Sequence, residues 1–228
     1  LSALKKDKKI VFSITPKYLK KMMFRYIEFP KFSLLGIFLN SLSVNLINFF
    51  ISNFYSLNYV GFVSHAFKYL GLPTVLIGKS VGQIFLQELN EVKNDTLATK
   101  KMFLMTLKKM ILFSCILFIP LYFFVENLFV FIFGDNWFLA GFYAKILIPL
   151  FFVRFIFNPL SLVNIVFEKQ KLSLLMHFIL FLFSLISMAI MYLFKMDIVD
   201  FLKIYSWVMI IVYLFLLYTL YRVSIKKI

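Results

Sequence analysis

The chain has 228 residues, of which 62% are hydrophobic, including 32 phenylalanines but only 7 glycines. Soluble domains average about 45–50% apolar residues, so this composition excludes an ordinary soluble domain and favours an all-α, polytopic membrane protein. The net charge of +15 makes nucleic acid a partner to test, and the single cysteine excludes an internal disulfide and a cysteine-based zinc site.

Residues 1–31 are basic and are interrupted by Pro16 and Pro30. Their lysines and arginine alternate with aromatic and aliphatic residues, which predicts a basic amphipathic linker helix on the cytoplasmic membrane surface. A solvated linker is the alternative interpretation. The segment lacks the apolar core and cleavage site of a signal peptide, and the chain begins with Leu1, so we expect it to be a fragment of a longer protein.

Six apolar runs follow, each close to the roughly 20 residues that a transmembrane helix needs. We place them at about 32–54, 59–88, 103–125, 141–166, 172–194 and 204–222. The second run is too long for an upright span, and Pro73 is expected to kink it. The sequence therefore predicts a bundle of six transmembrane helices, which we treat as one lobe over 32–228.

The distribution of lysine and arginine sets the orientation of these spans, because both residues favour cytoplasmic segments. With the N-terminus inside, most of the 25 basic residues are cytoplasmic, and the outer loops hold only Lys195 and Lys203. We therefore predict that both termini are cytoplasmic in a multi-pass membrane protein. The basic excess is then a topology signal and membrane lipids are its partners, with no nucleic acid.

The first span carries a polar stripe at helical spacing. The stripe consists of Ser41, Asn45, Asn48 and Ser52. Such side chains either hydrogen-bond to a neighbouring helix or form the wall of a water-filled cavity, and the sequence leaves both interpretations open.

The second span adds charge to a similar face, on which His65, Lys68 and Lys79 are aligned if the helix is regular. Lys68 and Lys79 are about 16 Å apart along the axis, so they cannot both reach the same membrane interface. Either one alone could do so.

The stretch 133–171 begins with a polar turn, continues as an apolar run and ends in basic residues. Arg154 lies near the middle of the run, where a guanidinium costs on the order of 2.5–3.5 kcal/mol unless it faces protein or water. Asn158 and Ser161 share its face, and Pro159 frees a backbone carbonyl that Asn158 or water could satisfy. Arg154 either faces a cavity or bonds to such carbonyls, whereas Lys145 is expected to extend to the outer interface.

Motifs for nucleotide, metal and acid–base chemistry are absent. Gly78-Lys79-Ser80 resembles the end of a phosphate-binding loop, but Pro73 stands where that pattern needs glycine. The two histidines are far apart, and all the acidic residues fall at span ends or in loops. We expect no cofactor, no metal and no enzymatic activity.

Several stretches resemble the bacterial polysaccharide and O-antigen flippases of the multidrug/oligosaccharidyl-lipid/polysaccharide exporter superfamily. They are YVGFVSHAFKYLGLP at 59–73 with Gln83, Ile84 and Phe85, FGDNWFLAGFYAKILIP at 133–149, Asn158-Pro159-Leu160, Glu168-Lys169-Gln170-Lys171, and the basic segment that ends at Phe29-Pro30. The resemblance covers nearly the whole chain. Many relatives carry Asp-Arg late in the first span, where this chain has Asn48-Phe49, so ion coupling through that carboxylate is in doubt.

The resemblance implies that the chain is the C-terminal six-span lobe, with the N-terminal lobe of the same protein as partner. It implies the translocation of a lipid-linked oligosaccharide on polyprenyl pyrophosphate by alternating access, for O-antigen, lipopolysaccharide or another cell-envelope polysaccharide. Basic residues would balance the pyrophosphate charge, and amides would bind sugar hydroxyls. The candidate substrate-binding residues are Arg154, Lys68, Lys79, His65, Asn45, Asn48 and Asn158.

Two other hypotheses remain. A multidrug-type exporter of the same superfamily would be expected to have acidic residues in its cavity. A membrane-embedded glycan polymerase or acyltransferase would be expected to have a large outer loop or an intramembrane catalytic carboxylate or histidine. The chain shows none of these features.

Overall fold

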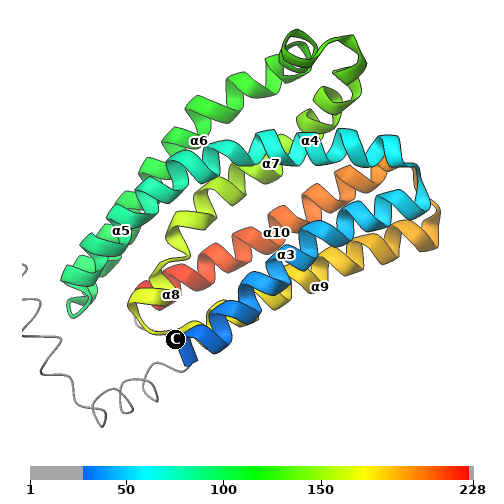
Figure 1. Ribbon diagram of the computed structural model, residues 1–228. Helices are drawn as coiled ribbons and strands as arrows, with labels where there is room; N and C mark the ends of the chain where they lie inside the picture. Colours follow the sequence, from blue (N-terminus) through cyan, green and yellow to red (C-terminus); the bar gives the residue numbers. More distant parts are fainter. Residues whose placement is uncertain (1–27, 226–228) are drawn as a thin grey trace, which may run out of the picture.

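The computed structural model describes residues 28–225, and every regular element in that range is helical (Figure 1). In chain order the elements are α3 (Glu28–Phe54), α4 (Leu57–Pro73), the π-helical turn η1 (Thr74–Gly78), α5 (Lys79–Val92), α6 (Thr96–Phe133), the 3₁₀ turn η2 (Asp135–Trp137), α7 (Phe138–Leu160), α8 (Val163–Val166), α9 (Gln170–Phe194) and α10 (Ile198–Ser224).

Six stretches are long and apolar enough to cross a membrane, with η1 joining α4 to α5 and α8 following α7 in the second and fourth. This confirms the all-helical, six-span prediction. The cytoplasmic location of the termini stays a prediction, and the expected linker helix lies outside the described residues except at its last four positions, which begin α3. We call the end of the bundle that holds the α5–α6 turn, α8 and the end of α10 the basic end (Figure 1).

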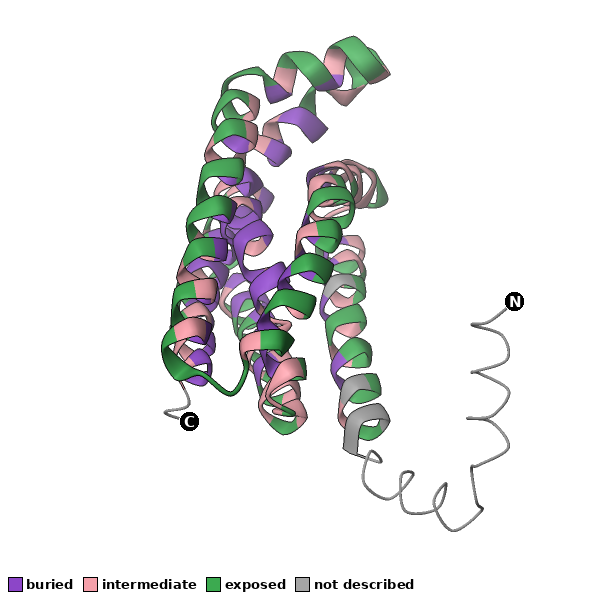
Figure 2. Ribbon diagram, turned by 90° about the vertical axis from the view of Figure 1, so that its left-hand side faces the viewer, coloured by how far each residue is buried: buried purple, intermediate pink, exposed green. Residues whose placement is uncertain are grey.

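Helix α7 is the centre of the bundle. In its most apolar window 61% of the residues are buried, against 17% for α6, and it packs against α4, α6 and α10. Leu147, Phe151 and Phe155 are fully buried on it. Figure 2 shows the buried residues gathered inside the bundle, with exposed residues on the outward faces of the helices. A helix enclosed in this way can present a charged side chain to neighbouring helices rather than to lipid.

The α6–α7 hairpin is joined by a tight polar turn. Gly134 ends α6 with a φ of 91°, and its amide donates to the carbonyl of Val130 at 2.8 Å. Glycine adopts this left-handed conformation without a Cβ clash. Lys145 was expected to extend to the interface, but its Nζ lies 2.9 Å from Oε2 of Glu126 on α6. Its ammonium thus has a carboxylate partner on the neighbouring helix, and its reach to the interface stays a prediction.

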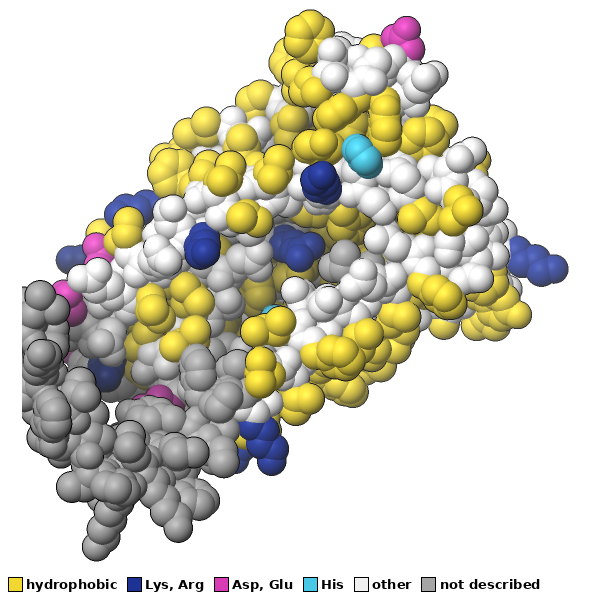
Figure 3. Space-filling model, in the orientation of Figure 1, with side chains coloured by type: hydrophobic (Ala, Val, Ile, Leu, Met, Phe, Trp, Pro, Cys, Tyr) yellow, Lys and Arg dark blue, Asp and Glu magenta, His cyan; other side chains and the backbone are white. Residues whose placement is uncertain are grey.

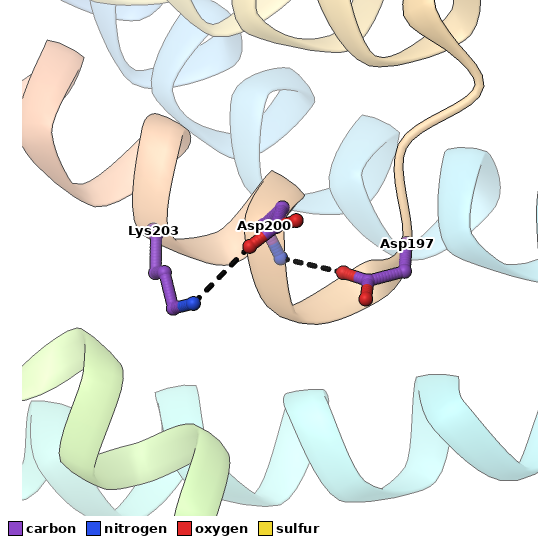
Figure 4. A network of polar contacts seen from close by, with 3 residues as sticks. All are labelled: Asp197, Asp200 and Lys203. Carbon is purple, nitrogen blue, oxygen red and sulfur yellow. Dashed lines mark hydrogen bonds and ion pairs between the residues drawn. The ribbon is translucent and has the colours of Figure 1, made fainter.

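The opposite end of the bundle is held together by contacts between turns. The Tyr55 hydroxyl, after α3, donates to the carbonyl of Met196 at 3.0 Å, and burial together with the charge of Asp197 raises the pKa of this phenol. Asp197 caps α10 by accepting from the amide of Asp200 at 2.8 Å, and Asp200 pairs with Lys203 at 3.1 Å (Figure 4). The Tyr55 bond joins the α3–α4 turn to the α9–α10 turn, and the other two contacts fix the start of α10.

The third and fourth spans differ most from the expected ones. Helix α6 begins at Thr96 and ends at Phe133, well beyond 103–125. Asp95 caps its polar first turns, and its mostly apolar last turns continue until Gly134. The expected run 141–166 is interrupted after Leu160. There the amides of Leu162 and Asn164 bond to carbonyls three residues earlier, which tightens the chain into turns before α8.

Candidate substrate pocket

A pocket of about 470 Å³ lies where α3, α4, η1 and α7 meet. It is lined by Ile47, Asn48, Ser64, Phe67, Lys68, Gly71, Leu72, Thr74, Val75, Phe151, Arg154 and Asn158. Figure 3 shows the hollow between α3 and α4, with basic side chains on its floor and along its α4–α5 rim. Four of the seven candidate residues thus lie in one pocket: Asn48, Lys68, Arg154 and Asn158.

The two cations of the pocket lie far from the ends of their candidate spans. Lys68 and Arg154 are each at least 11 residues, or about 16 Å, from either end of their spans. The Arg154 guanidinium lies 5.6 Å from the ring centroid of Phe151, and the Lys68 ammonium lies 5.6 Å from that of Tyr69. Within residues 28–225 neither cation has a hydrogen bond or a carboxylate partner, so cation–π contacts are the recorded compensation for their charge.

The polar stripe of α3 divides between both interpretations left open by the sequence. Asn48 lines the pocket, and its Oδ1 accepts a hydrogen bond of 3.0 Å from the Ser64 hydroxyl of α4. Asn45 is exposed and donates to the carbonyl of Ser41 in its own helix at 2.8 Å. Only Asn48 therefore serves as both a helix contact and a cavity wall.

His65 does not reach the pocket. Its ring lies 4.1 Å, centroid to centroid, from that of Trp137 in η2, and it also contacts the rings of Tyr69 and Phe133. The imidazole is part of an aromatic cluster that attaches α4 to the α6–α7 turn. Histidine is aromatic as well as polar, and here the aromatic contacts determine its position.

Lys79 also lies outside the pocket, exposed at the first position of α5. The alignment with Lys68 assumed a regular α-helix through Pro73, but Thr74–Gly78 form a π-helical turn. Such a turn accommodates an extra residue, so the spacing that aligns Lys79 with Lys68 on a regular α-helix no longer applies. The structure places this π-helical turn directly after Pro73, where a kink was expected.

Ser64, Thr74 and Asn158 supply further polar groups to the pocket. Ser64 and Thr74 were not among the sequence candidates, and the Thr74 hydroxyl oxygen is buried with no hydrogen-bond partner in the described residues. Ser64 stands four residues before Lys68, a spacing that could have identified it. The backbone carbonyl of Asn158 accepts from the Ser161 hydroxyl at 2.7 Å. The side-chain amide of Asn158 takes no part in this bond, and Asn158 lines the pocket.

The charged side chains of the pocket are all basic. No acidic residue is among its lining residues, all of which are described. Residues 28–225 also contain no cluster of three or more histidine, cysteine, aspartate or glutamate side chains that could hold a metal. The arrangement suits an anion with hydrogen-bonding groups beside it, in a half-apolar setting.

A family model described as "Polysaccharide biosynthesis protein" matches residues 5–140, more than half of the chain. The chain belongs to this family. The family is related to flippases, and its members are generally transport proteins rather than enzymes. No curated protein and no solved structure matches the chain.

The family match includes α3, α4, η1, α5 and α6, and so contains Asn48 and Lys68 of the pocket. Arg154 and Asn158 come from α7 and lie beyond the matched residues. The pocket of this polysaccharide biosynthesis protein is thus built partly from the family region and partly from the helix that follows it.

Proposed function

We propose that this polysaccharide biosynthesis protein is one lobe of a flippase that moves a lipid-linked oligosaccharide across the bacterial cytoplasmic membrane. The observation that carries the proposal is the presence of two cations, Lys68 and Arg154, without carboxylate partners in a pocket at membrane depth. A charge in a span that lacks a carboxylate partner is costly, and such residues usually lie on a substrate or ion pathway.

The chemistry of polyprenyl pyrophosphate fits this pocket. Its pyrophosphate is a compact anion that Arg154 can bind with two parallel N–H donors and Lys68 with its ammonium. The sugars need hydrogen-bonding groups, because polar groups lose several kcal/mol in hydrocarbon without them. Asn48, Asn158, Ser64 and Thr74 supply those groups.

The proposal includes a second lobe and alternating access. The pocket is bordered by α3, α4 and α7 of this chain, and an N-terminal lobe of the same protein would close its remaining side. Relative rocking of the two lobes would then open the pocket to either side of the membrane. O-antigen and lipopolysaccharide precursors are the substrates we propose for it.

The decisive experiment uses the intact protein in cells that depend on it for surface polysaccharide. We expect Arg154→Ala and Lys68→Ala to reduce export of the lipid-linked sugar by roughly 10–100-fold, since each removes a charge-assisted contact. Arg154→Lys should retain part of the activity because it keeps the charge. Lys195→Ala, an exposed change at the opposite end, serves as control. Unchanged export by Arg154→Ala at normal expression would refute the charge role.

One feature favours a second candidate, a multidrug-type exporter of the same superfamily. Part of the pocket lining is apolar, including Ile47, Phe67, Val75 and Phe151, which suits an amphipathic small molecule. The basic charge argues against cationic drugs. Efflux of an amphipathic anion from vesicles that lack lipid-linked sugars, abolished by Arg154→Ala, would favour this candidate.

A further inference from the structure

An apolar groove runs along the side of α7 that faces away from the polar pocket. Two cavities of about 480 and 440 Å³ lie between α6 and α10, and both have Phe152 and Val153 of α7 as their floor. α7 separates α6 from α10 along much of the bundle (Figure 1). We call the two cavities together the α6–α10 groove.

The groove has the length of a membrane's hydrocarbon core. On α6 its lining extends from Phe103 to Phe123, 20 residues or about 30 Å. The cavity nearer the basic end covers about half of that depth, and its lining has no polar side-chain groups except the hydroxyls of Tyr218 and Tyr221. An acyl chain of one leaflet fits its length and chemistry.

Three basic residues stand together at the mouth of this cavity. The Thr99 hydroxyl donates to the carbonyl of Ser224 at 2.8 Å, and the rings of Phe103 and Tyr221 are 6.0 Å apart. This register between antiparallel helices places Lys100 and Lys101 of α6 at the level of Arg222 of α10. Lys100 also precedes Leu104 and Leu107 by four and seven residues, which is the helical face that lines the groove.

These cations are available to a ligand. Lys100 and Lys101 are exposed, and no carboxylate in residues 28–225 forms an ion pair with them or with Arg222. The Arg222 guanidinium is held by Tyr218, whose hydroxyl accepts from Nη1 at 3.2 Å, while Nε is buried with no partner in the described residues. Clusters of this kind at a helix boundary bind anionic lipid head groups.

We propose that the α6–α10 groove and its basic mouth form a binding site for an anionic phospholipid such as phosphatidylglycerol. The lipid phosphate lies among Lys100, Lys101 and Arg222, and one acyl chain fills the cavity lined by Phe103, Leu107 and Leu217. The site lies on the other side of α7 from Arg154 and is independent of the proposed transport function.

Thermal unfolding and native mass spectrometry of the purified protein test this proposal. Phosphatidylglycerol at about 100 times its dissociation constant should raise Tm by roughly 5–10 °C, and phosphatidylcholine with the same chains should not. Lys100→Gln combined with Lys101→Gln should weaken phosphatidylglycerol binding about 30-fold. The charge-matched control combines Lys93→Gln with Lys109→Gln; Lys109 lies roughly opposite Lys100 around α6.

A further variant and a further ligand test the groove separately from the basic residues at its mouth. Leu104→Trp fills the cavity and should remove the stabilisation while the basic mouth is intact, and glycerol phosphate, which lacks acyl chains, should not stabilise the protein. Equal stabilisation by the two lipids in the wild-type protein would overturn the proposal without any variant. Equal loss of binding in both double variants would also overturn it. So would dissociation of an oligomer by Leu104→Trp, measured by light scattering, because the groove would then be a protein interface.

Discussion

Gly141 of α7 has no side chain, and α6 occupies the space that a side chain would need. A Cβ at this position would lie 2.8 Å from Cα of Glu126 and 3.1 Å from Cβ of Phe129. Cα of Glu126 belongs to the α6 backbone, which cannot move by a rotamer change, so the two helices would have to separate. The ion pair between Glu126 and Lys145 depends on the same close approach.

We predict that Gly141→Ala destabilises the protein by about 1–3 kcal/mol, the usual cost of overpacking. Gly61 of α4 is the matched control, because nothing lies within 4 Å of its Cβ position. Gly61→Ala should be neutral or stabilise by up to about 1 kcal/mol, since alanine favours helix. Unfolding in a detergent titration measures both, and equal losses would contradict the packing argument.

At the scale of elements, α3 is connected to α4 through few polar groups. The hydrogen bond between Ser64 and Asn48 joins the two helices inside the pocket, whereas Asn45 and Asn53 bond only to groups of α3 itself. Asn48 therefore contributes a hydrogen bond to the packing of α3 against α4, whereas the hydrogen bonds of Asn45 and Asn53 stay within α3.

We expect Asn48→Ala to lower the free energy of unfolding by about 0.6–1.7 kcal/mol, which are the average and the maximum measured for hydrogen bonds between membrane helices. Asn45→Ala should change it little, since it removes only a contact within α3. The two variants can be compared by the same detergent titration. An equal effect of both would show that α3 is held by its apolar packing on α9 instead.

The sequence predicted the six spans because apolar runs and basic flanks are local properties of the chain. It also identified Pro73 as a point of distortion. It could not predict that Lys79 leaves the pocket, because the π-helical turn Thr74–Gly78 changes the winding in a way that residue spacing does not record. His65 was assigned by its polarity, yet its position is set by Trp137, more than 70 residues later in the chain.

At the scale of the whole molecule, six spans place both ends of the described chain on one side of the membrane. The α5–α6 turn with Lys93 lies at that end, and the α9–α10 turn with Lys195 lies at the other. The positive-inside rule then predicts that the basic end faces the cytoplasm.

We predict that cysteines at these two turns react with a membrane-impermeant maleimide from opposite sides. Cys115, the free cysteine in α6, is first replaced by serine. Lys93→Cys should then be labelled only in inverted vesicles, and Lys195→Cys in intact cells, with Lys203→Cys labelled like Lys195→Cys. Labelling of Lys93→Cys in intact cells would reverse the orientation.

The length of α6 has a practical consequence for imaging. Its 38 residues span about 57 Å, nearly twice the hydrocarbon core, so the polar hairpin formed by α5 and α6 extends beyond the bilayer. Asp95 fixes the start of α6 through the amides of Leu97 and Ala98, and only a short turn separates the helices. A folded body grafted at Lys93 through continuous helices would hold a fixed direction, and would give a 27.0 kDa particle the fiducial mark that electron cryomicroscopy needs.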